Sequence, residues 1–210
     1  MTNIAHTWEM HCHSTFSDGT LSAQGVYDLA LERQLEHLVL TDHDTAAGYR
    51  WLREHGTLSE SLRLWSGAEL STVWMKRSVH IVGIGMDVMS SAWKAVEARY
   101  DQARESRFER LLFVLRREGL TLDEAAIRAQ ADGATLGRPH IARYLVDTGQ
   151  AKDSAQAFKR WLGNGKVGDV KQSWPELEQA VADIVDNGGW AVLAHPHRYK
   201  LTWRKLEQLL

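Results

Sequence analysis

Short runs of apolar residues alternate, over residues 1–91, with stretches in which apolar residues recur every three or four positions. The runs lie at 8–10, 37–41, 62–65 and 79–84. Helices are expected between them, one capped by Ser22 and a second around residues 49–53. Strand and helix therefore alternate, a pattern that predicts a parallel sheet or barrel with right-handed crossovers.

The pattern changes to helix alone between residues 92 and 165. Helices are expected at 92–118, at 122–131, after Pro139, and in a segment that ends near Trp161. A helix near Pro175, a strand at 190–194 and a final helix at 202–210 then resume the α/β pattern. The sequence therefore predicts an α/β unit at 1–91 and 166–210, with a helical insertion at 92–165 that caps its site.

This pattern contains five core strands, and no strand follows the final helix. A barrel of five parallel strands would expose unpaired backbone groups along an open edge. We therefore expect the sequence to be a shortened version of a longer protein.

Composition excludes several classes of protein. The chain has 210 residues, 44% of them hydrophobic, which is enough for a sizeable core, and its nine tryptophans are assigned to core packing by default. With 25 Lys and Arg against 27 Asp and Glu, no positive field recruits a long duplex nucleic acid. Cys12 is the only cysteine, so a disulfide and a cysteine-based zinc finger are both excluded within the chain.

We expect no export signal at the N-terminus. Residues 1–10 lack the apolar stretch of a signal peptide, and no other run is long and apolar enough to cross a bilayer. We therefore expect a cytoplasmic protein that does not act at a membrane. The oligomeric state is not indicated by the sequence.

Histidines and carboxylates follow the ends of the predicted strands, which is where parallel α/β folds place their chemistry. His11 and His13 are two positions apart, so in an extended strand both imidazoles point to the same side. Asp18 lies in a Ser-Asp-Gly segment and is either a ligand or an ordinary turn residue. Imidazole and carboxylate together suit borderline divalent ions, so these residues indicate a metal site.

Further candidates follow along the chain. His43 is expected to be a ligand, while the aspartates on either side of it support it or cap the next helix. Glu69 offers a carboxylate that can bridge two cations. His80 lies inside an apolar strand, where a lone histidine is more typically a hydrogen-bonded core residue. His195 precedes Pro196, which holds the backbone extended at the strand end, and is a stronger ligand candidate.

One pair of candidates lies in the predicted insertion. Arg138 and His140 flank a proline at the start of a helix, where a guanidinium and an imidazole suit an anion. A common helix start with proline in its first turn explains the same three residues equally well.

Taken in order, these segments resemble the PHP family, named for polymerase and histidinol phosphatase domains. The matching segments are 11–14 (His-Cys-His-Ser), 17–19 (Ser-Asp-Gly), 41–44 (Thr-Asp-His-Asp), 67–69 (Gly-Ala-Glu), 79–80 (Val-His) and 194–196 (Ala-His-Pro). Segments 137–140, 161–166 and 194–199 are similar to the TrpH-like branch, which contains nucleoside 3′,5′-bisphosphate phosphatases and a 5′→3′ exoribonuclease. The resemblance implies a distorted (β/α)₇ barrel with a trinuclear metal site.

The resemblance also implies a ligand set. A first metal would be held by His11, His13 and Glu69, a second by Glu69, His80 and His195, and a third by Asp18 and His43. Glu69 and His195 would be the catalytic residues. The expected cofactors are two or three divalent ions, with Mn²⁺ ahead of Zn²⁺, Fe²⁺ and Mg²⁺.

The chain departs from the family pattern in two places. A late Asp-x-His motif does not occur before Leu210, which implies that the barrel lacks its last two strands and one ligand of each of two metals. His197 stands where a small or variable residue is expected, and would be an extra imidazole facing solvent.

The implied activity is a metal-dependent phosphoesterase. It would release the 3′-phosphate of nucleoside 3′,5′-bisphosphates, trim short 5′-phosphorylated RNA in the 5′→3′ direction, or do both, with Arg138 and His140 gripping the phosphate that is not attacked. The alternatives are a histidinol-phosphate-type phosphatase, and a truncated module that binds metal without turnover.

The long helix of the insertion contains an interrupted apolar stripe. The stripe consists of Trp93, Val96, Tyr100 and Ala103, and its continuation reaches Arg107 and Arg110. Either the stripe shifts to Phe108 and leaves both arginines in solvent, or one arginine turns toward the barrel mouth and contacts the substrate.

Overall fold

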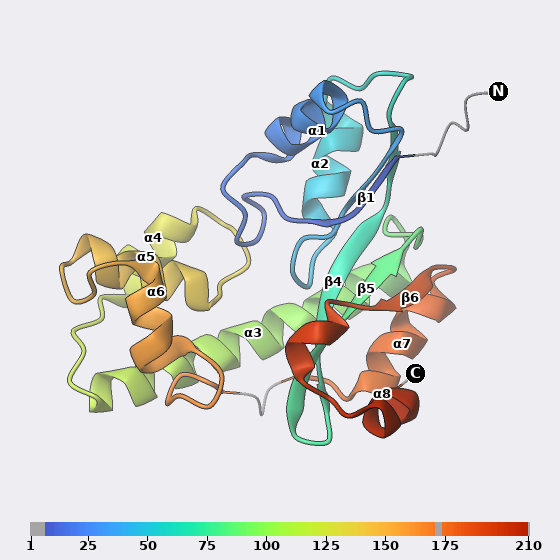
Figure 1. The fold of residues 1–210 in the computed structure, drawn as a ribbon. Helices are drawn as coiled ribbons and strands as arrows, with labels where there is room; N and C mark the ends of the chain where they lie inside the picture. Colours follow the sequence, from blue (N-terminus) through green and yellow to red (C-terminus); the bar gives the residue numbers. More distant parts are fainter. Residues whose placement is uncertain (1–6, 171–173, 210) are drawn as a thin grey trace.

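The computed structural model describes residues 7–170 and 174–209 as a mixed α/β protein, in which two small sheets lie beside a block of helices (Figure 1). The first sheet contains, in spatial order, the parallel strands β1 (Trp8–Cys12), β2 (His37–Leu40) and β3 (Arg63–Trp65). They are connected through α1 (Ala23–Glu32), which Ser22 caps by accepting the N–H of Gly25, and α2 (Ala47–His55). The predicted alternation of strand and helix is confirmed for this sheet.

The second sheet is antiparallel, so the prediction of parallel strands throughout was wrong. It contains β4 (Gly67–Trp74), β5 (Arg77–Ile84) and β6 (Trp190–Leu193). Met75 and Lys76, which join β4 to β5, have φ angles of 46° and 62°, the left-handed conformation of a two-residue hairpin turn. Such turns usually carry glycine or asparagine, and because this one carries neither, the sequence pattern missed β4.

The two sheets meet at the candidate site. Only Ser66 separates β3 from β4, and beyond the end of β2 His43 forms an isolated parallel bridge with Glu69. The Asp44 N–H donates to the Glu69 carbonyl at 2.9 Å, and the Glu69 N–H donates to the Asp42 carbonyl at 3.1 Å. The described strands form these two sheets and no closed barrel, so the (β/α)₇ barrel stays a prediction.

The remaining helices lie close to their predicted positions. They are α3 (Ser91–Arg117), α4 (Glu124–Ala131), α5 (Arg138–Asp147), α6 (Ser154–Ala157), the π-helical turn η1 (Phe158–Leu162), α7 (Leu177–Asp186), the 3₁₀ turn η2 (Pro196–Tyr199) and α8 (Trp203–Leu209). Two predictions concern residues that lie partly outside the described ranges. Leu210 of the predicted last helix is one such residue, and residues 1–6, in which no signal peptide is expected, are the others. Across 7–170 and 174–209, no helix combines the length and the apolar character that a bilayer crossing requires.

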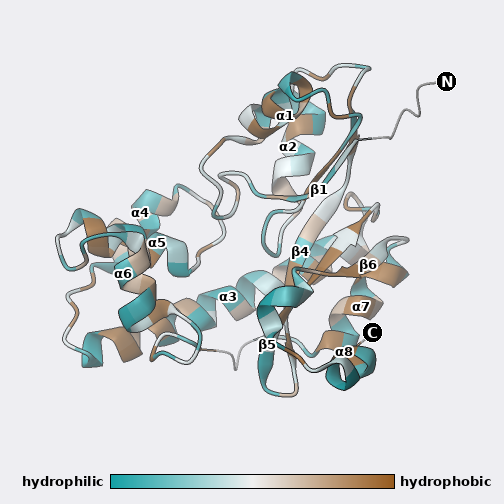
Figure 2. Ribbon diagram, viewed as in Figure 1, coloured by the Kyte–Doolittle hydropathy of each residue, from teal (hydrophilic) through white to brown (hydrophobic). Residues whose placement is uncertain are grey.

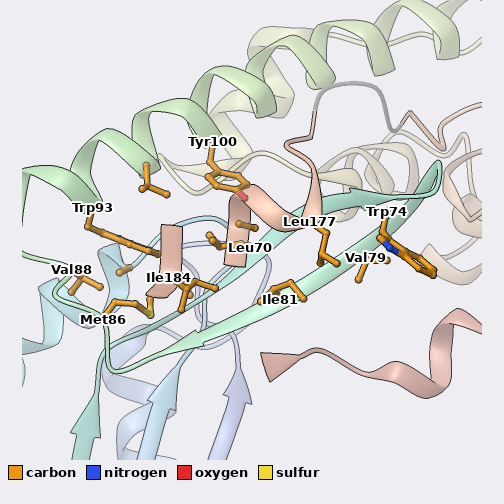
Figure 3. Packing of buried hydrophobic residues seen from close by; sticks show 14 of the residues in the cluster. Leu70, Trp74, Val79, Ile81, Met86, Val88, Trp93, Tyr100, Leu177 and Ile184 are labelled. Carbon is orange, nitrogen blue, oxygen red and sulfur yellow. The ribbon is translucent and has the colours of Figure 1, made fainter. Parts of the chain in front are cut away.

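One helix, α3, contributes to two hydrophobic clusters. Its first half packs Trp93 and Tyr100 against the second sheet and α7, as Figure 3 shows around Leu70 and Ile184. The second half faces a separate cluster with residues from α4 and α5, and contributes Phe108, Leu111, Leu112 and Leu115. Hydrophilic and hydrophobic residues accordingly alternate along this helix in Figure 2.

The interruption of the α3 stripe coincides with the change from one cluster to the other. The apolar positions shift to Phe108, as one alternative predicted. The two arginines nevertheless differ in solvent exposure. Arg107 is only 7% exposed, whereas Arg110 is exposed and lies near the ring of Phe113. The prediction that both are solvated was therefore wrong for Arg107.

Candidate metal centre

Five imidazoles surround the carboxylate of Glu69, which is 1% exposed. Oε2 of Glu69 lies 3.0 Å from Nε2 of His11 and 3.1 Å from Nε2 of His13. Its Oε1 lies 2.9 Å from Nδ1 of His80 and 2.9 Å from Nε2 of His195. Side chains from four strands or their ends therefore converge on one buried carboxylate.

Local geometry explains this convergence. His11 and His13 lie at the carboxyl end of β1, where the pairing with β2 shifts register between Glu9 and Cys12. His80 lies on β5 directly opposite Ser71, which is two residues beyond Glu69 on β4. Residues two apart share a face of a strand, so His80 points to the face that carries Glu69. Sequence reasoning that treated His80 as a core histidine lacked this register.

His195 reaches the site from the end of β6, where its φ of 31° lies in the left-handed region. The extended backbone expected before Pro196 is therefore not observed. Its ring stacks on the ring of His11 with a centroid distance of 5.6 Å. The two sheets thus bring their histidines into contact at a single point.

Asp18 and His43 extend the group to one side. Asp18 Oδ1 lies 3.7 Å from Nδ1 of His13, and its Oδ2 lies 3.8 Å from Nε2 of His43. These separations exceed a hydrogen bond but suit groups that share a cation. The turn that carries Asp18 requires glycine at position 19, because a Cβ there would lie 2.3 Å from the His13 carbonyl oxygen.

The neighbouring aspartates support this arrangement and cap no helix, since the N-cap residue of α2 is Ala46. Asp42 accepts hydrogen bonds from the N–H and Oγ of Ser14 and from Oγ of Ser17, each at 2.7 Å, and so fixes the loop between His13 and Asp18. Asp44 accepts from the Ser71 N–H at 2.5 Å and from Nε of Arg104 at 2.6 Å. Of the two predicted roles, the supporting one is confirmed.

The protonation states follow from burial and contact. Burial alone would raise the pKa of Glu69, but hydrogen bonds from His11, His13, His195 and His80 outweigh it and hold that pKa far below its usual range. Burial lowers the pKa of His43 well below its ordinary value, so its imidazole is neutral near pH 7. The centre therefore combines an ionised carboxylate with neutral imidazole at His43.

This donor set fits divalent cations. Nδ1 of His43 lies 3.3 Å from Oε2 of Glu69, yet it is buried and forms no hydrogen bond with any described residue. Three overlapping groups each bring three donor atoms within 4.8 Å of one another: His11, His13 and Glu69; His13, Asp18 and His43; and His43, Glu69 and His80. Imidazole nitrogens and an ionised carboxylate are ligands for zinc, manganese or iron, and a cation would satisfy the buried Nδ1 of His43.

A cavity of about 680 Å³ opens from this centre. The metal-centre residues form one wall, and arginines from helices line the other, namely Arg104 and Arg107 of α3 and Arg138 of α5. Arg138 lies at the first position of α5 and donates from Nη1 to the Leu162 carbonyl at 2.8 Å. The predicted phosphate-binding arginine therefore lies in the same cavity as the histidines.

His140 is placed differently from Arg138. It is buried and is not among the cavity-lining residues. Its Nδ1 accepts the N–H of Gly137 at 3.1 Å, a hydrogen bond that caps the start of α5. Burial, followed by the charge of Arg143, lowers its pKa. These contacts give His140 a structural role, and its substrate contact stays a prediction.

Sequence reasoning missed several residues of the cavity. Tyr199 accepts the His80 N–H at 2.9 Å, lies 5.4 Å from the His195 ring, and has its pKa raised to about 12, chiefly by burial. Arg104 and Trp174 also line the cavity. No spacing signal marks these three, although Arg104 lies three residues before the Arg107 that the stripe singled out. His197 is exposed, as expected.

The sequence of this chain is similar to those of several bacterial proteins. No protein-family model matches the chain. The chain is 38% identical, over 212 residues, to the 5′-3′ exoribonuclease Rnm of Escherichia coli, covering 100% of this chain and 72% of the relative. It is also 38% identical over 212 residues to the 3′,5′-nucleoside bisphosphate phosphatase of Chromobacterium violaceum, covering 96% of this chain and 71% of that protein.

A solved structure shares the fold. The crystal structure of a protein from Bifidobacterium adolescentis, provisionally described as a metal-dependent phosphoesterase, superposes with a TM-score of 0.84 at 27% identity. The match covers 98% of this chain and 74% of that protein. Sequence and structure therefore lead to the same group of relatives.

Proposed function

Because this chain belongs to the PHP family, with the 5′-3′ exoribonuclease Rnm and the 3′,5′-nucleoside bisphosphate phosphatase, we propose that it hydrolyses phosphate esters of nucleotides with divalent metals. Its substrates are nucleoside 3′,5′-bisphosphates, which lose the 3′-phosphate, or short 5′-phosphorylated RNA, which is shortened in the 5′→3′ direction. The observation that carries this proposal is the convergence of five imidazoles on the ionised carboxylate of Glu69.

The proposed ligands divide into three sets. His11, His13 and Glu69 would hold one metal, Glu69, His80 and His195 would hold a second, and Asp18 and His43 would serve a third. Glu69 and His195 are the proposed catalytic residues because they would hold the metals. When bound, divalent ions supply Lewis acidity, which lowers the pKa of water and offsets negative charge on phosphoryl oxygens. Mn²⁺ is the proposed ion.

The chain's own residues orient the substrate. Arg138 lines the same cavity as the metal centre, so its guanidinium can hold the phosphate that is not attacked. When one phosphate is anchored at Arg138, the other phosphate can reach the metal centre in only a narrow range of orientations. In a bisphosphate the anchored group is the 5′-phosphate, and in RNA it is the 5′-terminal phosphate.

Metal removal tests the proposal. The full chain, treated with a chelator, should lose hydrolysis of adenosine 3′,5′-bisphosphate and of 5′-phosphorylated RNA, and Mn²⁺ should restore both. RNA with a 5′-hydroxyl should be shortened more slowly because it lacks the anchored phosphate. Hydrolysis that persists unchanged in the chelator would contradict a metal mechanism.

A further inference from the structure

The cavity extends beyond the metal centre. Its volume of about 680 Å³ lies within the range of sites that enclose a whole small molecule, and is much larger than a phosphate needs. The histidines line one part of it, while residues of α3 and α5, together with Phe158, Gly163, Asn164 and Trp174, line another. A nucleotide whose phosphorus lies at Glu69 therefore has room for its sugar and base against the helical wall.

That wall carries concentrated positive charge. The guanidinium of Arg104 is paired with the carboxylate of Asp44. Nε of Arg107 donates to the Val170 carbonyl at 2.8 Å. Burial, together with the charges of Arg138 and Arg104, lowers the pKa of Arg107 to about 9. Several guanidiniums in one buried wall favour an anionic ligand lying alongside them.

Trp174 lies on this wall beside the same arginines. The guanidinium carbons of Arg104 and Arg107 are each 5.3 Å from the centroid of its ring. The two arginines are three residues apart on α3 and so approach the indole from the same helix. These contacts fix the orientation of the ring, and the ring itself forms part of the cavity lining.

Arg104 also links the indole to the metal centre. Its Nε donates to Asp44 at 2.6 Å, and Asp44 directly follows the candidate ligand His43. One guanidinium therefore contacts both the indole and the residue that follows His43. This arrangement places an aromatic surface within the reach of a base whose own phosphate lies at the centre.

We propose that Trp174, oriented by Arg104 and Arg107, is the surface on which the nucleobase of the substrate stacks. This inference rests on the proposed function and assigns a base-binding subsite within the same cavity. Every nucleobase offers a flat π-face, so stacking binds a base with little preference among the four. The subsite distinguishes nucleotides from phosphate esters that carry no base.

The test compares adenosine 3′,5′-bisphosphate with the abasic analogue in which hydrogen replaces the base. The ratio of their kcat/KM values in the Mn²⁺-loaded wild type should be about tenfold or more, the size of one base stacking on an aromatic ring. Trp174→Ala and Trp174→Leu should reduce this ratio toward one, while Trp174→Phe should retain most of it. Trp203→Ala is the matched control, because Trp203 is 75% exposed and does not line the cavity.

The outcomes separate the two proposals. If the wild type hydrolyses neither compound, the proposed function fails. Equal hydrolysis of both compounds by the wild type overturns the base subsite alone. The subsite is also overturned if Trp174→Leu keeps the ratio as well as Trp174→Phe, since bulk and not stacking then matters. A ratio lost in Phe158→Ala but kept in Trp174→Ala assigns the base to Phe158, which also lines the cavity, and overturns the proposal for Trp174.

Discussion

The two walls of the cavity are built in different ways. The metal-centre wall is formed by side chains at strand ends or within β5, all directed at Glu69. The helical wall is formed by Arg104, Arg107 and Arg138, whose positions depend on how α3 and α5 pack. The strand wall is therefore fixed by local register, and the helical wall by tertiary packing.

This difference separates two functions within one site. Pairing between adjacent strands sets the positions of donor atoms closely, as metal ligation requires. Long arginine side chains on helices cover more space and bind phosphate by charge and forked hydrogen bonds. We expect changes to the strand wall to act on metal and turnover, and changes to the helical wall to act on substrate binding.

The largest effect is expected for Glu69→Gln. The amide cannot replace an ionised carboxylate shared by five imidazoles, so hydrolysis should fall about a thousandfold, as expected for the loss of several kcal/mol of metal stabilisation. His43→Ala should cost less, about ten- to a hundredfold. Steady-state rates and bound Mn²⁺ measured on both variants show whether Glu69→Gln loses more activity than His43→Ala. Glu178→Gln, at an exposed position on α7, is the control. Full activity of Glu69→Gln would refute the metal mechanism.

Arg138→Ala should affect binding and leave the metal in place. Loss of one charge-assisted contact to a phosphate should raise KM for adenosine 3′,5′-bisphosphate about tenfold. Kinetics combined with metal analysis of the purified variant test this. A loss of Mn²⁺, or an unchanged KM, would give Arg138 a structural role through its bond to the Leu162 carbonyl.

Arg107 and Arg110 form a matched pair on α3. Arg107 lines the cavity while Arg110 is exposed, so Arg107→Ala should slow the shortening of 5′-phosphorylated RNA about fivefold and Arg110→Ala should have little effect. Rates measured on RNA and on the mononucleotide show whether Arg107 contacts the first nucleotide or a later one. Equal behaviour of the two variants would contradict the assignment of Arg107 to the substrate wall.

The smallest effect concerns His140, the histidine of the helical block. Burial lowers its pKa, so it stays neutral in the fold while the unfolded chain takes up a proton below about pH 6.5. Stability from this residue is therefore present at neutral pH and declines as the pH falls below that value. Thermal unfolding at pH 7.5 and 5.5 should show a drop a few degrees larger in wild type than in His140→Gln. His197→Gln, at an exposed position, should behave like wild type.

The sequence predicts some residues of each wall and misses others. The group formed by His11, His13 and Glu69 was predictable because its residues lie in short motifs next to apolar runs. β4 was not, because Met75 and Lys76 adopt a hairpin turn that their side chains do not signal. Trp174 was assigned to the core by default, since only the packing of α3 shows that two arginines hold it beside the cavity.

The unbroken course of α3 limits how this chain can vary in length. Each residue of an α-helix advances the helix by about 100° around its axis. One residue added or removed between Tyr100 and Arg104 would rotate everything beyond it, turning Arg107 away from the cavity and Phe108 out of its cluster. Loops of the helical block can absorb insertions, whereas this stretch of α3 cannot gain or lose a residue without displacing both side chains.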